Sequence, residues 1–164
     1  MSLLPRITEK ARELVSREFD TRGPDVCMAE VIEHLERHNP ELLDMAAKCA
    51  ADLDDPGKAM VGFGVFYRLL VGSLPAIAGP RTLTPLPRVS AGTRMQLVAE
   101  IDEKGVETFT REAIVELENS NPELLQMAHN FASGLEDYLQ AMQGFALLYK
   151  ALLIQSRAVR ATLH

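Results

Sequence analysis

The stretch Glu30-Val-Ile-Glu-His-Leu-Glu-Arg-His-Asn-Pro-Glu-Leu-Leu-Asp-Met-Ala46 returns 82 positions later as Glu112-Ala-Ile-Val-Glu-Leu-Glu-Asn-Ser-Asn-Pro-Glu-Leu-Leu-Gln-Met-Ala128. The match needs no gap. From residue 12 to residue 70, about two residues in five are identical at this offset, which predicts internal duplication. We call the residue 82 positions further along the counterpart of a given residue.

Each copy is predicted to form roughly four helices. The first helices are expected from about residue 8 to 20 and from about residue 93 to 103. Each is followed by a glycine, Gly23 or Gly105, a residue that tolerates the left-handed conformation that closes a helix. The second helices carry apolar residues at helical spacing and are expected to stop before Pro40 and Pro122, because the residue before proline avoids the helical region.

The third helix is expected to begin at Asn39-Pro40 and, in the second copy, at Asn121-Pro122. The asparagine side chain would accept hydrogen bonds from free amide groups, and proline suits the first helical position. The fourth helix of the first copy is expected to begin at Asp55-Pro56. The second copy has Tyr138 in place of this proline, so its third and fourth helices are expected to merge or to meet at a smaller kink.

The fourth helices are apolar nearly all round, which is typical of buried helices. We expect them to pack together around a pseudo-twofold axis. Gly62 and Gly144 are retained in both copies despite their cost within a helix, which favours a close backbone crossing. The predicted fold is therefore all-α: a tandem duplication of a roughly four-helix unit, packed as one pseudo-twofold helical bundle.

The predicted organisation is repeat unit 1 over residues 1–73, a connector over residues 74–92, and repeat unit 2 over residues 93–164, with both units in one compact domain. The connector is expected to be poor in helix because it holds Pro75, Pro80, Pro85 and Pro87. Its apolar residues predict that it lies against the protein: Leu74, Ile77, Leu83 and Leu86.

The net charge of -6 argues against a nucleic-acid partner, since phosphate binding needs a basic surface. The most apolar run, residues 61–79, contains Arg68 and four glycines, so no membrane partner is expected. The charged N-terminal residues do not resemble a signal peptide, and a cytoplasmic location is expected. Cys27 and Cys49 have phenylalanine counterparts, which indicates buried apolar positions. No cofactor is predicted.

Tyr67 and Tyr149 are retained polar positions on the fourth helices, and each is followed by a base, Arg68 or Lys150. In the functional interpretation, these four residues form two symmetry-related anion sites and bind a ligand. In the structural interpretation, the tyrosine hydroxyl lies at the rim of the core and the base pairs with a nearby carboxylate. The residues alone leave both interpretations open.

His34 and His38 lie four residues apart, with Glu30 one turn earlier, so their side chains share one face of a helix. This spacing can present metal ligands, but no third ligand is identifiable and the alternative is two surface histidines. The acidic residues of the second helices lack the Glu-x-x-His motif of di-iron bundles. His34 and His38 are therefore weak metal candidates.

The sequence contains no phosphate-binding loop, nucleophile elbow or zinc-protease helix, and it does not reveal the biochemical function. The first hypothesis is a non-enzymatic helical module for protein interaction or regulation, which would bind another protein or a second copy of itself. The alternative is a binder of a small apolar or anionic ligand in a pocket between the two repeats. An enzyme of unfamiliar type is the least favoured hypothesis, and the oligomeric state stays open.

Overall fold

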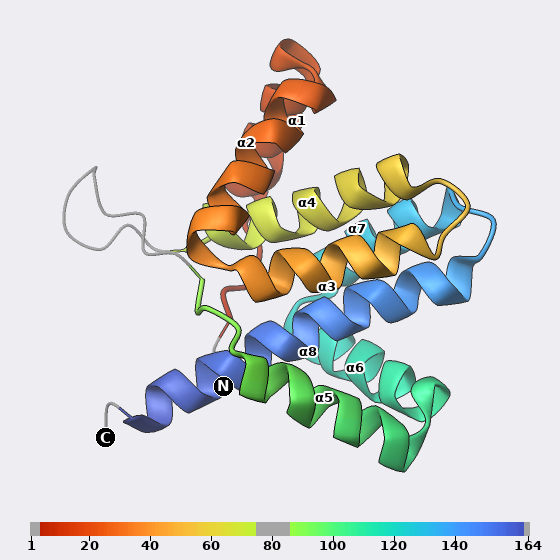
Figure 1. Cartoon of the computed structure of the whole chain (residues 1–164). Coiled ribbons are helices and arrows are strands. Elements are labelled where there is room, and N and C mark those ends of the chain that lie inside the picture. The colour runs from red at the N-terminus through yellow and green to blue at the C-terminus, as the bar shows by residue number, and fades with distance from the viewer. Residues whose placement is uncertain (1–3, 75–85, 163–164) are drawn as a thin grey trace.

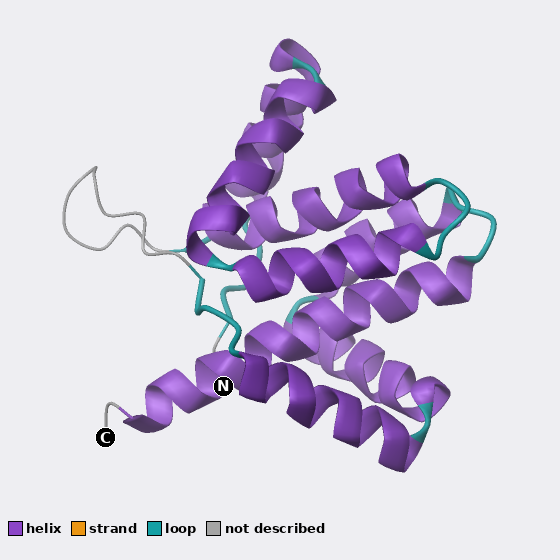
Figure 2. Cartoon of the chain, viewed as in Figure 1, coloured by secondary structure: helices purple, strands orange, loops and turns teal. Residues whose placement is uncertain are grey.

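The computed structural model describes residues 4–74 and 86–162, with side chains described as far as residue 159. These ranges contain helices and loops and no strand, which confirms the predicted all-α class (Figure 2). The helices are α1 (Glu9–Arg22), α2 (Pro24–His38), α3 (Pro40–Ala51), α4 (Pro56–Gly72), α5 (Ala91–Lys104), α6 (Val106–Ser120), α7 (Pro122–Ser133) and α8 (Tyr138–Thr162). We call α1–α4 the N-terminal half and α5–α8 the C-terminal half.

Helices α3, α4, α7 and α8 lie at the centre of the molecule, with the α1–α2 hairpin on one side and the α5–α6 hairpin on the other (Figure 1). Helix α3 of the N-terminal half packs on α8 of the C-terminal half, and α4 packs on α7. A single apolar core includes buried residues from all eight helices. The two halves therefore complete each other's core.

The predicted glycine turns are confirmed. Gly23 separates α1 from α2 with φ of 87°, and Gly105 separates α5 from α6 with φ of 88°. Both have ψ near 150°, a combination that only glycine adopts readily. Both hairpins thus depend on a residue without a Cβ atom.

The predicted capping role of Asn39 and Asn121 is wrong. Each residue stands at the start of a third helix, but neither side chain bonds to that helix. Instead, the side-chain amide of Asn39 donates to the Pro87 carbonyl oxygen at 3.0 Å and accepts from the Val89 amide at 2.9 Å. Proline at the first helical position already removes one free amide, so the buried asparagine is available for a contact with another segment.

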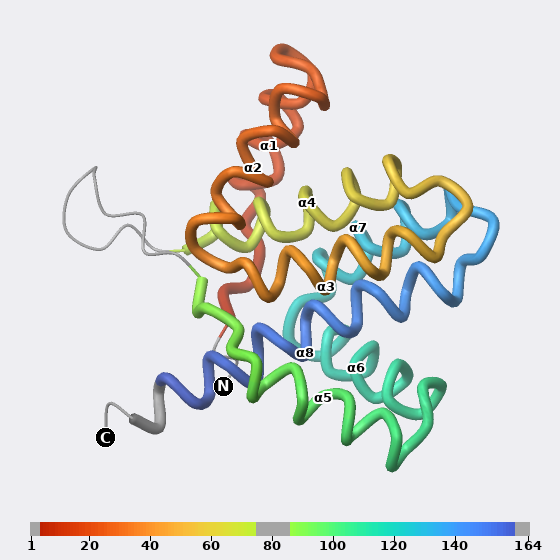
Figure 3. Tube along the Cα trace, in the orientation of Figure 1, coloured from red at the N-terminus to blue at the C-terminus, as the bar shows by residue number. Residues whose placement is uncertain are grey.

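The Asn121 side chain makes the same pair of bonds to the N-terminal segment. It donates to the Pro5 carbonyl oxygen at 2.9 Å and accepts from the Ile7 amide at 3.1 Å. Thus each asparagine holds the segment that leads into the first helix of the other half. In the Cα trace, the segment that leads into α5 passes beside the turn between α2 and α3 (Figure 3). The apolar residues of these two lead-in segments are buried: Leu4, Ile7, Leu86 and Val89.

Helices α7 and α8 do not merge, contrary to one of the two expectations, and they meet at a loop rather than a kink. Helix α7 ends at Ser133 and α8 begins at Tyr138. The Asp137 side chain accepts from the Gln140 amide at 2.9 Å, just as Asp55 accepts from the Lys58 amide at 3.1 Å before α4. The aspartate cap is sufficient to start the helix without the proline.

Helices α4 and α8 are in contact, as expected for the two fourth helices. The contact is made by aromatic rings: the Phe63 and Phe145 ring centroids lie 4.9 Å apart. A Cβ atom added at Gly144 would lie 2.7 Å from the Phe63 ring, and one added at Gly62 would lie 3.0 Å from the Phe131 ring. The glycines therefore make room for aromatic side chains of the helices that face them.

Most of the predicted connector, including Pro75, Pro80, Pro85, Ile77 and Leu83, lies outside the described residues. The described end of the connector does lie against the protein, since Leu86 is buried. Within the described ranges, no helix has the length and apolar character needed to cross a bilayer.

Candidate functional site

Tyr67 and Arg68 line a pocket of about 200 Å³ between α1, α2 and α4. We call it the N-terminal pocket; it is lined by Glu18, Phe19, Cys27, Glu30, Val31, His34, Tyr67, Arg68 and Val71. All of these residues belong to the N-terminal half. The sequence hypothesis placed Tyr67 and Arg68 at a pocket between the two repeats, whereas the N-terminal pocket lies within one half.

The polar wall of the N-terminal pocket is built by two pairs of side chains. His34 Nε2 lies 3.1 Å from the Tyr67 hydroxyl, and an Arg68 Nη2 atom lies 3.2 Å from a Glu18 carboxylate oxygen. Glu30, at the outer edge, pairs with Arg22. The structural interpretation of Arg68, pairing with a carboxylate, is therefore correct, and the same residue also faces a pocket.

Burial sets the protonation states of the Tyr67–His34 pair. It raises the pKa of Tyr67 to about 12, because ionising the phenol would place a charge in a poorly solvated position. Burial also lowers the pKa of His34, and the neighbouring His38 and Arg68 lower it further. At neutral pH the pair is therefore uncharged, and its ring nitrogen and hydroxyl can hydrogen-bond to a ligand.

His34 and His38 lie close together, with ring centroids 4.7 Å apart. His34 is hydrogen-bonded to Tyr67, however, and no group of three or more potential metal ligands occurs among the described residues. The arrangement thus gives no support to these histidines as metal ligands.

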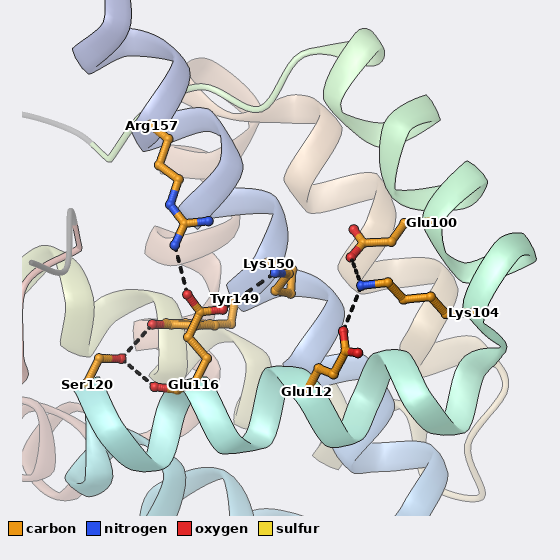
Figure 4. Close-up of polar contacts among 8 residues, drawn as sticks. All are labelled: Glu100, Lys104, Glu112, Glu116, Ser120, Tyr149, Lys150 and Arg157. Atoms are coloured by element: carbon orange, nitrogen blue, oxygen red, sulfur yellow. Dashed lines mark hydrogen bonds and ion pairs between the residues drawn. The ribbon is translucent and has the colours of Figure 1, made fainter.

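The residues around Tyr149 and Lys150, drawn in Figure 4, differ from those around Tyr67 and Arg68. The Tyr149 hydroxyl lies 2.9 Å from the Ser120 hydroxyl, and Lys150 lies 3.5 Å from the Glu116 carboxylate. Arg157 reaches the same carboxylate at 2.9 Å. Ser120 and Glu116 are the counterparts of His38 and His34, so the two predicted anion sites are not equivalent.

A larger cavity, of about 570 Å³, does lie between the halves. We call it the inter-half groove. Its walls come from α1 and α4 of the N-terminal half and from α7 of the C-terminal half, and its apolar floor consists of Val15, Phe19, Val61, Val65, Leu69, Met127 and Phe131. Arg12 lies at its rim and makes no ion pair within 4 Å in the described part of the chain.

The corresponding region on the other side of the molecule is more closed. There Arg94, the counterpart of Arg12, pairs with Glu41 at 3.1 Å and with Asp44 at 2.6 Å. In the inter-half groove, Gln126 replaces Asp44, and Glu123 pairs with Arg6 instead. A cavity on this other side, lined by residues of α3, α5, α6 and α8, has about 190 Å³.

No protein-family model matches the chain, and no curated protein or solved structure matches it at a significant level. The candidate sites therefore rest on the geometry alone.

Sequence reasoning missed the residues that give the N-terminal pocket its shape and the asparagines that join the halves. The signal for the pocket was a difference between the copies, since Cys27 is far smaller than its counterpart Phe109. The signal for the asparagines was the recurrence of Leu4-Pro-Arg-Ile7 as Leu86-Pro-Arg-Val89, at the same offset of 82 residues. The sequence similarity at this offset therefore continues on the N-terminal side of Arg12.

Proposed function

We propose that this protein is a non-enzymatic binding module with one small-molecule site, the N-terminal pocket. One observation carries the proposal: within one half, Arg68 and the neutral Tyr67–His34 pair line a cavity whose other walls are mostly apolar. Ligand pockets commonly have this composition: mostly apolar walls with a few placed polar groups. The proposal follows the alternative hypothesis from the sequence, with the site moved from between the repeats into the first one.

The proposal includes a tandem duplication that assembles as one pseudo-twofold body. Support comes from the repeated hydrogen bonds at the offset of 82 residues: Asn39 to Pro87 and Val89, and Asn121 to Pro5 and Ile7. Because each half holds the lead-in segment of the other, neither would have its native contacts alone. On this account, the C-terminal half acts as scaffold and the N-terminal half carries the site.

A fragment screen on the whole protein tests the small-molecule proposal. Ligand-observed NMR with single-ring fragments should find binders whose signal changes disappear in a Cys27→Phe variant, since phenylalanine would occupy the pocket. Val26→Phe is the matched control, because Val26 is exposed and does not line the pocket. A screen in which no binder responds to Cys27→Phe, while the variant keeps its helical circular dichroism spectrum, would contradict the proposal.

A second function is favoured by the inter-half groove, and it corresponds to the protein-interaction hypothesis. An apolar floor flanked by helices can receive the apolar face of an amphipathic helix. Arg12, unlike its doubly paired counterpart Arg94, would meet an acidic residue of such a partner. The expected occupant is therefore an amphipathic helix with a carboxylate near one end.

Selection from a displayed library of helical peptides tests this second function. Enriched peptides should carry apolar residues at i, i+3 or i+4 and one acidic residue, and Val65→Lys should remove their binding. Arg12→Glu should shift the preference from an acidic to a basic residue. If the same peptides are enriched with the native protein and with both variants, the groove is excluded as the binding surface. Val26→Lys, which lies outside the groove, is the control.

A further inference from the structure

We infer that the ligand of the N-terminal pocket is a small carboxylate with an apolar body about the size of one aromatic ring. This inference rests on the proposed function and adds the chemical class of the ligand. It follows from comparing the pocket with the corresponding region of the C-terminal half, where side chains of the protein itself provide both a carboxylate and a ring.

Four charged positions around the pocket recur in both halves. Two acids and two bases surround the N-terminal pocket, and their counterparts have the same signs of charge: Glu18, Arg22, Glu30 and Arg68, and Glu100, Lys104, Glu112 and Lys150. The charges of each quartet sum to zero. Any difference in charge preference between the two regions must therefore come from other residues.

The main difference is the residue that faces the base on the fourth helix. In the C-terminal half this residue is Glu116, whose carboxylate binds Lys150 and Arg157 (Figure 4). In the N-terminal half it is His34, which is hydrogen-bonded to Tyr67. Arg68 thus lacks the carboxylate from the second helix that Lys150 has, and its ion-pair partner among the described residues is Glu18 of α1.

Arg68 retains the capacity to bind a second carboxylate. Its bonds to Glu18 both come from Nη2, at 3.2 and 3.5 Å, and no hydrogen bond involves its Nε or Nη1 atom in the described structure. A guanidinium group has five N–H donors and can bind a carboxylate through two of them at once. A ligand carboxylate can therefore bind Arg68 while Glu18 stays in place.

The second difference is size. Phe109 is almost fully buried in the C-terminal half, whereas Cys27 stands at this position in the N-terminal half and lines the pocket. The pocket volume of about 200 Å³ slightly exceeds the roughly 150 Å³ of an apolar cavity that accepts benzene. Phe19, Val31 and Val71 supply apolar contacts for a ring. The pocket therefore has room for a single aromatic ring.

Titrations with three single-ring probes test the charge of the ligand: benzoate, neutral benzamide and cationic benzylamine. Measured by NMR or calorimetry on the whole protein, benzoate should bind at least about tenfold more tightly than either of the others, because only benzoate pairs with Arg68. Arg68→Gln should remove this preference. Tighter binding of benzylamine would overturn the inference and assign the site to the carboxylates of Glu18 and Glu30.

Further variants replace a residue of one half by the residue found at its counterpart position in the other half. Each new side chain therefore already occurs in the corresponding environment of this fold. His34→Glu should weaken benzoate binding at least tenfold more than it changes benzamide binding, because it supplies the carboxylate internally. Cys27→Phe should abolish binding of both probes. If this substitution disturbs folding, Cys27→Leu replaces it as the test variant and should weaken binding of both probes. Glu116→His, in the C-terminal half, is the control that should leave benzoate binding unchanged.

The outcomes distinguish this inference from the proposal on which it rests. Equal binding of benzoate and benzamide, abolished by Cys27→Phe, would overturn the carboxylate assignment and keep the pocket as a binding site. Binding of benzoate that Cys27→Phe does not change would place it elsewhere and overturn the inference. Absence of benzoate binding at millimolar concentration would overturn it as well, and the fragment screen would then decide the proposed function separately.

Discussion

The side-chain amide of Asn121 donates a hydrogen bond of 2.9 Å to the carbonyl oxygen of Pro5, which lies 116 residues earlier in the chain. The bond joins the start of α7 to the segment that leads into α1. Asn39 makes the corresponding bond to Pro87. Helices of one half are thereby tied to the first helix of the other, which explains how two small helical units can form one stable core.

Asn121→Ala is expected to lower the free energy of unfolding by roughly 2–4 kcal/mol, since it leaves a buried amide and a half-buried carbonyl without partners. Asn39→Ala should have a similar effect. Urea unfolding followed by circular dichroism measures both changes. Arg6→Ala is the control, because the exposed Arg6–Glu123 pair should contribute no more than about 1 kcal/mol. A loss below 1 kcal/mol for both asparagine variants would contradict their structural role.

Gly144→Ala should destabilise the protein, because the new Cβ atom would lie 2.7 Å from the Phe63 ring. The expected loss is about 1–3 kcal/mol, typical of overpacking in a core. Gly57 is the matched control near the start of α4. A Cβ atom there would have its nearest neighbour at 3.7 Å, so Gly57→Ala should be neutral or slightly stabilising. Thermal unfolding of both variants makes the comparison, and equal melting temperatures would refute the packing argument.

His34 should make the protein less stable as the pH falls below about 6.5, the ordinary pKa of histidine. Its pKa is lowered in the folded state by burial and by His38 and Arg68, so the unfolded chain binds the proton more readily. The stability that His34 contributes is therefore present above pH 6.5 and is lost on acidification. NMR titration of the imidazole should give a pKa below that of a model peptide. A pKa above 6.5 would contradict the neutral Tyr67–His34 pair.

Tyr67 should make stability fall at high pH. Its pKa is raised to about 12 by burial, while the unfolded chain ionises near pH 10. Between these two values the unfolded state loses a proton that the folded state keeps, so the free energy of unfolding decreases with rising pH. Urea unfolding at pH 9, 10 and 11 measures this slope. The Tyr67→Phe variant should have a smaller slope, and an unchanged slope would show that Tyr67 is not its source.

Much of the fold could be predicted from the sequence because local signals and the repeat agree. The glycines at 23 and 105 and the proline at 40 fix where helices end and begin, and these signals act within a few residues. The Asn39 side chain could not be assigned in this way. The Asn39 side chain could bond either to its own helix or to the segment at Pro87. Which of the two it binds depends on a contact between residues 48 positions apart in the chain.

The candidate site was predicted only in part. Tyr67 and Arg68 do line a pocket, because a polar group retained on an apolar helix must find a partner or a cavity. Their counterparts Tyr149 and Lys150 were expected to behave alike. The two pairs behave differently because the residue facing them on the second helix differs. Glu116 binds Lys150, whereas its counterpart His34 bonds to Tyr67. The asymmetry thus depends on positions that differ between the halves, so the positions that agree could not predict it.

Chemical-shift mapping on the whole ¹⁵N-labelled protein tests the central claim, one open pocket in the N-terminal half, most directly. The measurement is a titration with the tightest single-ring probe, followed at the backbone amides of both halves. We expect saturable shifts at Cys27, His34 and Arg68, and no comparable shifts at Phe109, Glu116 and Lys150. Equal shifts in the two halves, or shifts confined to the C-terminal half, would contradict the account.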